Sequence, residues 1–229
     1  MTRLTRIAPL VGVAYAGLVI AALANGNTPD TTDSSAKVIA FYTKHHDAQR
    51  ATVYLLALAA VCAVAFYGVL GTHLRSRGAR TTTAVMFGGG VLLAAAMTVA
   101  AGLNLALTDH TSGLSPSAAQ ALNYLAGDGF AATLFAGVAV TMAAAGFAVL
   151  QTRALPVWLG WVALVSAVGS VTGVLSWPAF LLNGLWTLVV SILLFRRGVQ
   201  ATPPVEASTI ELPGARESTE TTQPHTATA

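Results

Sequence analysis

The sequence predicts an all-α membrane protein: a polytopic bundle of six transmembrane helices, with two short external amphipathic helices and a disordered cytoplasmic tail. The first observation is composition, because 55% of the 229 residues are hydrophobic and only 9% are charged, whereas soluble domains carry about 25% charged residues. The second is that the apolar residues gather in blocks, each close to the roughly 17–25 residues that a helix needs to cross the hydrocarbon core. The third is that none of these blocks contains Asp, Glu, Lys or Arg. The six predicted spans are 7–24, 51–71, 84–106, 129–150, 156–175 and 178–195.

The first block also fits a cleaved signal peptide. Arg3 and Arg6 precede the apolar run, and Ala22-Leu23-Ala24 resembles an A-x-A cleavage site. The run is longer than the usual hydrophobic region of about 7–15 residues, which favours a retained span. If residues 1–24 were cleaved, five helices with an external amino terminus would remain.

The basic residues predict the orientation. With the amino terminus inside, the twelve Lys and Arg residues divide nine to three in favour of the cytoplasmic side, as the positive-inside rule expects. The cytoplasmic set is Arg3, Arg6, Arg75, Arg77, Arg80, Arg153, Arg196, Arg197 and Arg216, and the outer set is Lys37, Lys44 and Arg50. We therefore expect a multi-pass protein of the cell (cytoplasmic) membrane with both termini in the cytoplasm. The net charge of +3 reflects this topology, so no nucleic-acid partner is predicted.

Two outer connections are long enough to contain the external helices. In the first, apolar and aromatic residues recur at helical spacing after the capping residue Ser34. In the second, Pro116 takes a first-turn position after Ser115. The two stripes are Val38, Phe41, Tyr42 and His45 in the first helix and Ala118, Ala121, Leu122 and Leu125 in the second. Both helices are expected to lie on the outer membrane surface or to cap the bundle.

The chain divides into two parts near residue 197. Residues 1–197 form the predicted six-helix transmembrane domain. Residues 198–229 are rich in Thr, Pro, Glu and Ser and lack a sustained apolar stripe, so a disordered cytoplasmic tail is expected there.

A group of polar residues falls in the two outer connections and at the helix ends beside them. It consists of His45, His46, Asp47, Asp109, His110 and Asp128. Imidazole and carboxylate are good ligands for transition metals, but adjacent residues on a helix point about 100° apart, and the i, i+4 histidine pair of zinc enzymes is absent. The better interpretation is a headgroup-facing cluster in which Asp47 caps the next helix. Asp47 and Asp128 are also among five identities that recur at one spacing along the chain, through duplicated hairpins or through chance in an Ala-rich sequence.

The predicted spans contain no Asp, Glu, Lys, Arg or His, and ion-coupled transport usually requires such a residue. The candidate residues that remain are Asn104 and Asn183, both expected in the outer half of the membrane, where they could line a small vestibule. Interhelical hydrogen bonds of about 0.6 kcal/mol each would also account for them. All the histidines lie in loops, at helix ends or in the tail, which disfavours haem. No metal, cofactor or catalytic residue is therefore predicted.

Four stretches resemble an uncharacterised actinobacterial family of six-helix integral membrane proteins, grouped as a domain of unknown function. They are "AKVIAFYTKHH" (36–46), "FGGGVLLAAA" (87–96), "RALPVWLGW" (153–161) and "LWTLVVSILLFRR" (185–197). The resemblance covers roughly residues 5–197, and Val157 departs from it where a basic residue is expected. It implies a fold and a membrane location, and it carries no activity.

These observations predict a protein that is not an enzyme. The first hypothesis is association, with lipid or with a membrane protein partner or second copy, through small-residue faces such as Gly88–Gly90 and Gly169-x-x-x-Gly173 and through the external helices. The alternative is a facilitator for a small neutral or apolar solute, with an outward-facing vestibule.

Overall fold

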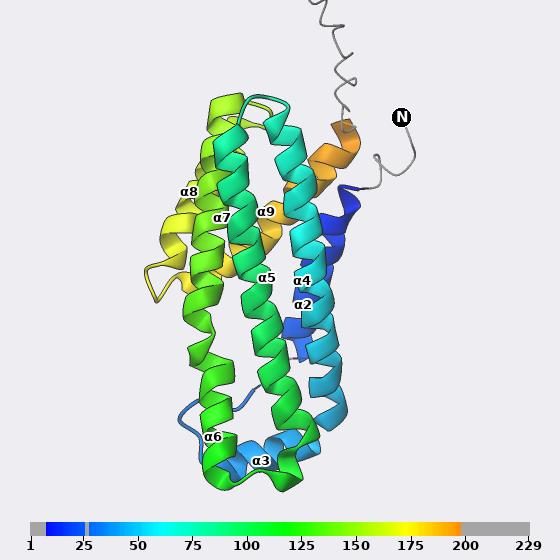
Figure 1. Cartoon of the computed structure of the whole chain (residues 1–229), viewed down its shortest axis with the longest axis vertical. Coiled ribbons are helices and arrows are strands. Elements are labelled where there is room, and N and C mark those ends of the chain that lie inside the picture. The colour runs from blue at the N-terminus through cyan, green and yellow to red at the C-terminus, as the bar shows by residue number, and fades with distance from the viewer. Residues whose placement is uncertain (1–7, 26–27, 198–229) are drawn as a thin grey trace, which may run out of the picture.

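The structure, a computed structural model, describes residues 8–25 and 28–197, and within these ranges it is helical with no strand (Figure 1). The α-helices are α2 (Leu10–Asn25), α3 (Ser35–Lys44), α4 (His46–Arg75), α5 (Arg80–Asp109), α6 (Pro116–Tyr124), α7 (Ala131–Thr152), α8 (Val157–Ser170) and α9 (Ser176–Arg197). A 3₁₀ turn, η1 (Thr111–Gly113), follows α5, and a π-helical segment, η2 (Leu125–Gly129), joins α6 to α7. The predicted tail, 198–229, lies outside the described residues.

Each of the six predicted spans contains a helix, but the helices differ in length. By length and hydropathy, four segments of the described chain could cross a membrane: His46–Arg75, Arg80–Asp109, Pro116–Thr152 and Ser176–Arg196. The described parts of the other two are shorter, 16 residues in α2 and 14 in α8. The prediction for 156–175 is wrong at its second end, because α8 stops at Ser170 and a turn follows.

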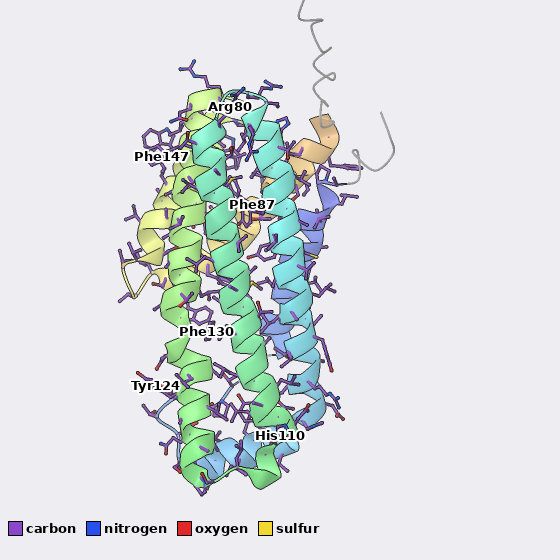
Figure 2. All side chains as sticks on the ribbon, in the orientation of Figure 1. Arg80, Phe87, His110, Tyr124, Phe130 and Phe147 are labelled. Carbon is purple, nitrogen blue, oxygen red and sulfur yellow. The ribbon has the colours of Figure 1, made fainter. Side chains whose placement is uncertain are left out.

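The six apolar helices form a ring. Each helix packs against the next in the order α2, α4, α5, α7, α8, α9, and α9 packs against α2 to close the ring. The α4–α5 turn, the α7–α8 turn, the start of α2 and the end of α9 lie at one end, here called the arginine-rich end because Arg75, Arg77, Arg80 and Arg153 lie there (Figures 1 and 2). Helices α3 and α6 lie at the opposite, α3–α6 end, and α9 is tilted across the bundle.

Glycines allow several helices to approach closely inside the ring. A Cβ at Gly137 of α7 would lie 2.6 Å from the backbone nitrogen of Leu93 in α5, and one at Gly146 of α7 would lie 2.9 Å from the carbonyl oxygen of Gly160 in α8. Such close contacts contribute dispersion energy. This matters between membrane helices because lipid supplies no hydrophobic driving force for their association.

The predicted small-residue faces are used differently from expectation. Gly89 and Gly90 pack inside the bundle, whereas Gly88 faces open space. Gly169 and Gly173 do not form a helical pair, because α8 ends between them and Gly173 has a positive φ of 73°. Most of these residues therefore serve packing within the chain.

The two short helices predicted for the long connections are present as α3 and α6. The hydroxyl of Ser115 accepts a hydrogen bond from Ala118 N, as expected of a cap, whereas Ser34 sits at the cap position of α3 without a side-chain bond. Val38, Tyr42 and Leu107 form a separate small core with Ala119 and Ala126. Helices α3 and α6 thus pack on each other and on α5.

Candidate functional site

The structure contains a cavity of about 170 Å³ on the α3–α6 side of the ring. An engineered apolar cavity of roughly 150 Å³ holds a benzene ring, so this one has room for an apolar group of similar size. The lining comes from α2, α4, α5, α7, α9, η2 and the segment before α3. The lining residues are Val19, Ala22, Leu23, Thr28, Gln49, Thr52, Leu56, Met97, Ala100, Asn104, Ala126, Gly127, Phe130, Leu134, Trp177 and Phe180.

The cavity exists because the ring is incomplete in this half. Helix α8 contributes nothing to its lining, and α9 contributes only its first residues, Trp177 and Phe180. The Trp177 indole packs edge-on against the rings of Phe135 and Phe180, with centroids 5.5 and 6.1 Å away. Phe130, at the junction of η2 and α7, supplies another aromatic wall (Figure 2). Aromatic side chains thus border the space where α8 is absent and only the first turns of α9 are present.

The solvent exposure of the lining residues distinguishes the floor of the cavity from its mouth. Met97 and Ala100 of α5 are buried and form part of the floor. Leu23, Thr28 and Trp177 line the cavity and are exposed, so they mark its mouth. The mouth therefore combines two large apolar side chains with one polar side chain.

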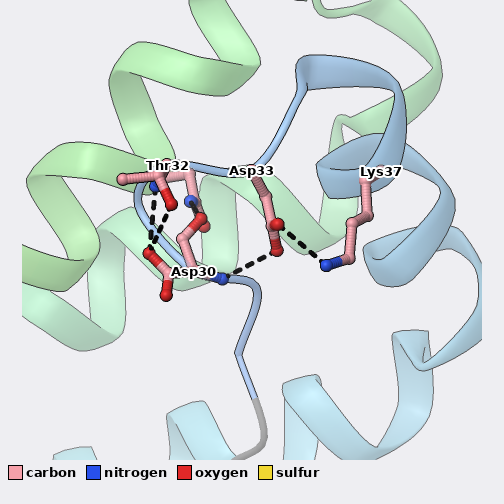
Figure 3. Close-up of polar contacts among 5 residues, drawn as sticks. Asp30, Thr32, Asp33 and Lys37 are labelled. Atoms are coloured by element: carbon pink, nitrogen blue, oxygen red, sulfur yellow. Dashed lines mark hydrogen bonds and ion pairs between the residues drawn. The ribbon is translucent and has the colours of Figure 1, made fainter.

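Residues 28–34, here called the strap, lead from the mouth towards α3. Thr32 donates two hydrogen bonds to the Asp30 carboxylate, which hold the pKa of Asp30 below its usual value. Asp33 accepts hydrogen bonds from Asp30 N and from Lys37 Nζ at 3.0 and 2.8 Å (Figure 3). Asn123 of α6 donates to Asp30 O. These bonds fix the strap against α3 and α6.

Asn104, predicted for a vestibule, lies on the cavity wall. Its amide oxygen accepts a hydrogen bond of 2.9 Å from the Tyr42 hydroxyl, and its amide nitrogen donates to Ala100 O. Burial raises the pKa of Tyr42 to about 12, so this hydroxyl keeps its proton at neutral pH. Asn104 therefore joins α5 to α3 beside the cavity.

Asn183 lies elsewhere, in the buried interior of the ring. Its amide oxygen accepts from the Tyr15 hydroxyl at 3.2 Å, and its amide nitrogen donates to the Tyr67 hydroxyl at 2.9 Å. The three side chains come from α2, α4 and α9, and none of them lines the cavity. Asn104 and Asn183, both predicted for a vestibule, thus belong to two separate hydrogen-bonded groups, and only Asn104 lines the cavity.

The external polar cluster is brought together only in part. His46 Nε2 lies 3.6 Å from Asp109 Oδ1, and His46 Nδ1 lies 3.1 Å from Asp47 Oδ1. His45 Nδ1 instead lies 3.0 Å from Phe41 O. Asp47 occupies the first turn of α4, where a carboxylate interacts favourably with the helix dipole.

His110 and Asp128 are exposed. Asp128 lies within η2, and the cap position of α7 is Phe130, so Asp128 does not cap that helix. Among the described residues, no three His, Cys, Asp or Glu side chains are grouped so that they could hold a metal ion.

Sequence reasoning missed most of the cavity. Gln49 is polar and buried near the start of α4, and Trp177 and Phe180 follow the α8–α9 turn. A glutamine two residues before the predicted span 51–71 was the available signal. Comparison with models of protein families, with curated proteins and with solved structures finds no match, so the resemblance to the actinobacterial family stays a prediction.

Proposed function

We propose that this chain is a non-enzymatic integral membrane protein that binds an amphipathic lipid, with part of the lipid's apolar chain in the cavity beneath Trp177. The observation that carries the proposal is the cavity itself: a mostly apolar space with a mouth formed by Leu23, Thr28 and Trp177. Because lipid tails are as apolar as the cavity wall, binding would rest on packing contacts with the lining and not on the hydrophobic effect.

The proposal includes six spans, with the arginine-rich end and both termini in the cytoplasm. The arginines at one end support this orientation through the positive-inside rule. Helix α2 packs in the ring core through Tyr15 and Val19, which supports its retention as a span. The α3–α6 end, with the external polar cluster, then lies outside, and the mouth opens near the outer membrane boundary.

Binding is favoured over passage because the ring is filled towards the arginine-rich end. Tyr15, Tyr67 and Asn183 are buried and bonded to one another there, and Phe66 and Trp186 fill the space beside them. A molecule in the cavity would meet this packed layer. A facilitator for a small neutral solute remains the alternative, and Asn104 on the cavity wall is the observation in its favour.

Filling the cavity tests the proposal. Ala100→Phe places a ring into the floor, while Ala95→Phe adds the same ring on the exposed face of the same helix. Native mass spectrometry of protein extracted in mild detergent counts the lipid molecules retained. We expect the wild type and Ala95→Phe to retain a lipid that Ala100→Phe loses. Equal retention by both folded variants would contradict lipid binding at this site.

A flux assay in vesicles distinguishes a solute facilitator from a lipid-binding protein. Asn104→Leu removes a polar group from the wall while adding apolar surface. If the chain were a facilitator, flux of a small neutral solute such as glycerol would occur in wild-type vesicles and fall in this variant. A lipid-binding protein is expected to show no flux above empty vesicles.

A further inference from the structure

The turn between α8 and α9, residues 171–175, is apolar and exposed. Val171, Val174 and Leu175 expose 70%, 90% and 54% of their surface. No charged residue occurs between Arg153 and Arg196. A turn bathed in water would ordinarily carry polar residues, because large exposed apolar patches mark interaction surfaces.

The backbone of this turn satisfies many of its own polar groups. Val174 N donates to Thr172 O, and Ser176 N donates to Gly173 O. The hydroxyls of Thr172 and Ser176 donate to Gly169 O and Ser170 O at 2.8 and 2.9 Å. Internal hydrogen bonds reduce the cost of placing a non-helical segment in a poorly hydrated environment.

The length of α8 places the turn short of the α3–α6 end. Its 14 residues rise about 21 Å, whereas the hydrocarbon core is about 30 Å thick. Figure 1 shows the turn partway along the bundle, well before α3 and α6. Trp158 and Trp161, exposed near the start of α8, suit the membrane boundary at the arginine-rich end. Measured from that boundary, the turn ends roughly 9 Å below the outer one.

We infer that the α8–α9 turn is immersed in the outer leaflet and that its partner is lipid, at the level of the acyl-chain segments just below the headgroups. Interfacial segments typically insert about 5–10 Å into this region. Trp177, two residues after the turn, suits the same level because its ring is apolar and its N–H is polar. The inference rests on the membrane residence and orientation proposed above, and it does not depend on which molecule fills the cavity.

Nitroxide labels measure the surroundings of the turn directly. Single cysteines replace Val174, Ser76 in the α4–α5 turn, and Gln120 on the exposed face of α6, after the free Cys62 has been changed to Ala. The labelled full chain is placed in bilayers, and power saturation is measured with oxygen, which concentrates in hydrocarbon, and with a water-soluble nickel chelate.

We expect oxygen to relax the label at 174 more than nickel does, and the reverse at 76 and 120. Nickel accessibility at 174 equal to that at 120 would place the turn in water and overturn the inference. Low accessibility to both reagents at 174 would show that another protein or a second copy covers the turn, and it would also overturn the inference. Neither result would depend on lipid retention in the cavity.

Discussion

Two of the short turns between helices, 76–79 and 171–175, use a similar backbone device with opposite side-chain chemistry. Each contains one glycine with positive φ, Gly78 at 106° and Gly173 at 73°. The first is flanked by Arg75 and Arg80 and contains Arg77, whereas the second carries only Val, Thr, Gly and Leu. A sharp turn between two helices therefore does not require polar side chains, and our proposal attributes the difference to the solvent around each turn.

The hairpins that these turns join also differ in reach. Helices α4 and α5 have 30 residues each and rise about 45 Å, which exceeds the hydrocarbon core by about 15 Å. Helix α8 has 14 residues and falls short of it. On the proposed membrane placement, the long hairpin carries the α3–α6 end beyond the hydrocarbon core. The short one leaves the ring incomplete where the cavity lies.

The largest expected effect comes from forcing α8 away from α7. Gly146→Leu would place a side chain against Gly160 O and Leu164, both 2.9 Å from the point that its Cβ would occupy. Overpacking of this kind costs up to about 3 kcal/mol. Gly88→Leu, which faces open space, serves as the matched variant. Unfolding measured in bilayer discs should show a loss of stability only for Gly146→Leu. Equal stability of the two variants would mean that the close contact between Gly146 and Gly160 does not hold α8 against α7.

A charge in the short hairpin's turn is expected to have the next largest effect. An Asp costs about 3 kcal/mol at the bilayer centre and less near the boundary, so Val174→Asp should lower stability by about 2 kcal/mol. Gln120→Asp adds the same charge in water and should cost about 0.5 kcal/mol or less. The same unfolding assay measures both. If the variants lost equal stability, the two regions would share one solvent.

Alkaline pH tests the packing of α3 at the α3–α6 end. The pKa of Tyr42 is raised to about 12 by burial, from the ordinary value of 10.0. Its contribution to stability is complete below pH 10 and is lost as pH rises from 10 to 12, at up to about 1.4 kcal/mol per pH unit. The difference in tyrosinate absorbance between wild type and Tyr42→Phe should appear above pH 11. Titration near pH 10 would show that α3 is not docked on Asn104.

The smallest effects should come from the two glycines. Alanine at either position meets no atom within 4 Å, so the cost is that of the left-handed backbone alone, about 1 kcal/mol. Gly78→Ala and Gly173→Ala should therefore lose similar stability in a thermal unfolding series. A large difference would show that the turns differ in backbone strain as well as in solvent.

Much of the helical layout could be predicted from the sequence, because apolar blocks without charge indicate membrane helices. The pairing of His46 with Asp109 was foreseeable too, since both lie at the same end of one hairpin. The end of α8 at Ser170 was not, because apolar residues continue through the turn and only Thr172 and Gly173 interrupt them. The partners of Asn183 arise from tertiary packing of three helices, which hydropathy does not report.

Chemical labelling tests directly whether the turns 76–79 and 171–175 meet different solvents on a chain that crosses the bilayer. Single cysteines at 76, 120 and 174, in a Cys62→Ala background, can be treated with a membrane-impermeant maleimide in intact and in permeabilised cells. We expect labelling at 120 in intact cells, at 76 only after permeabilisation, and at 174 in neither. Labelling of 76 and 120 from the same side would contradict it.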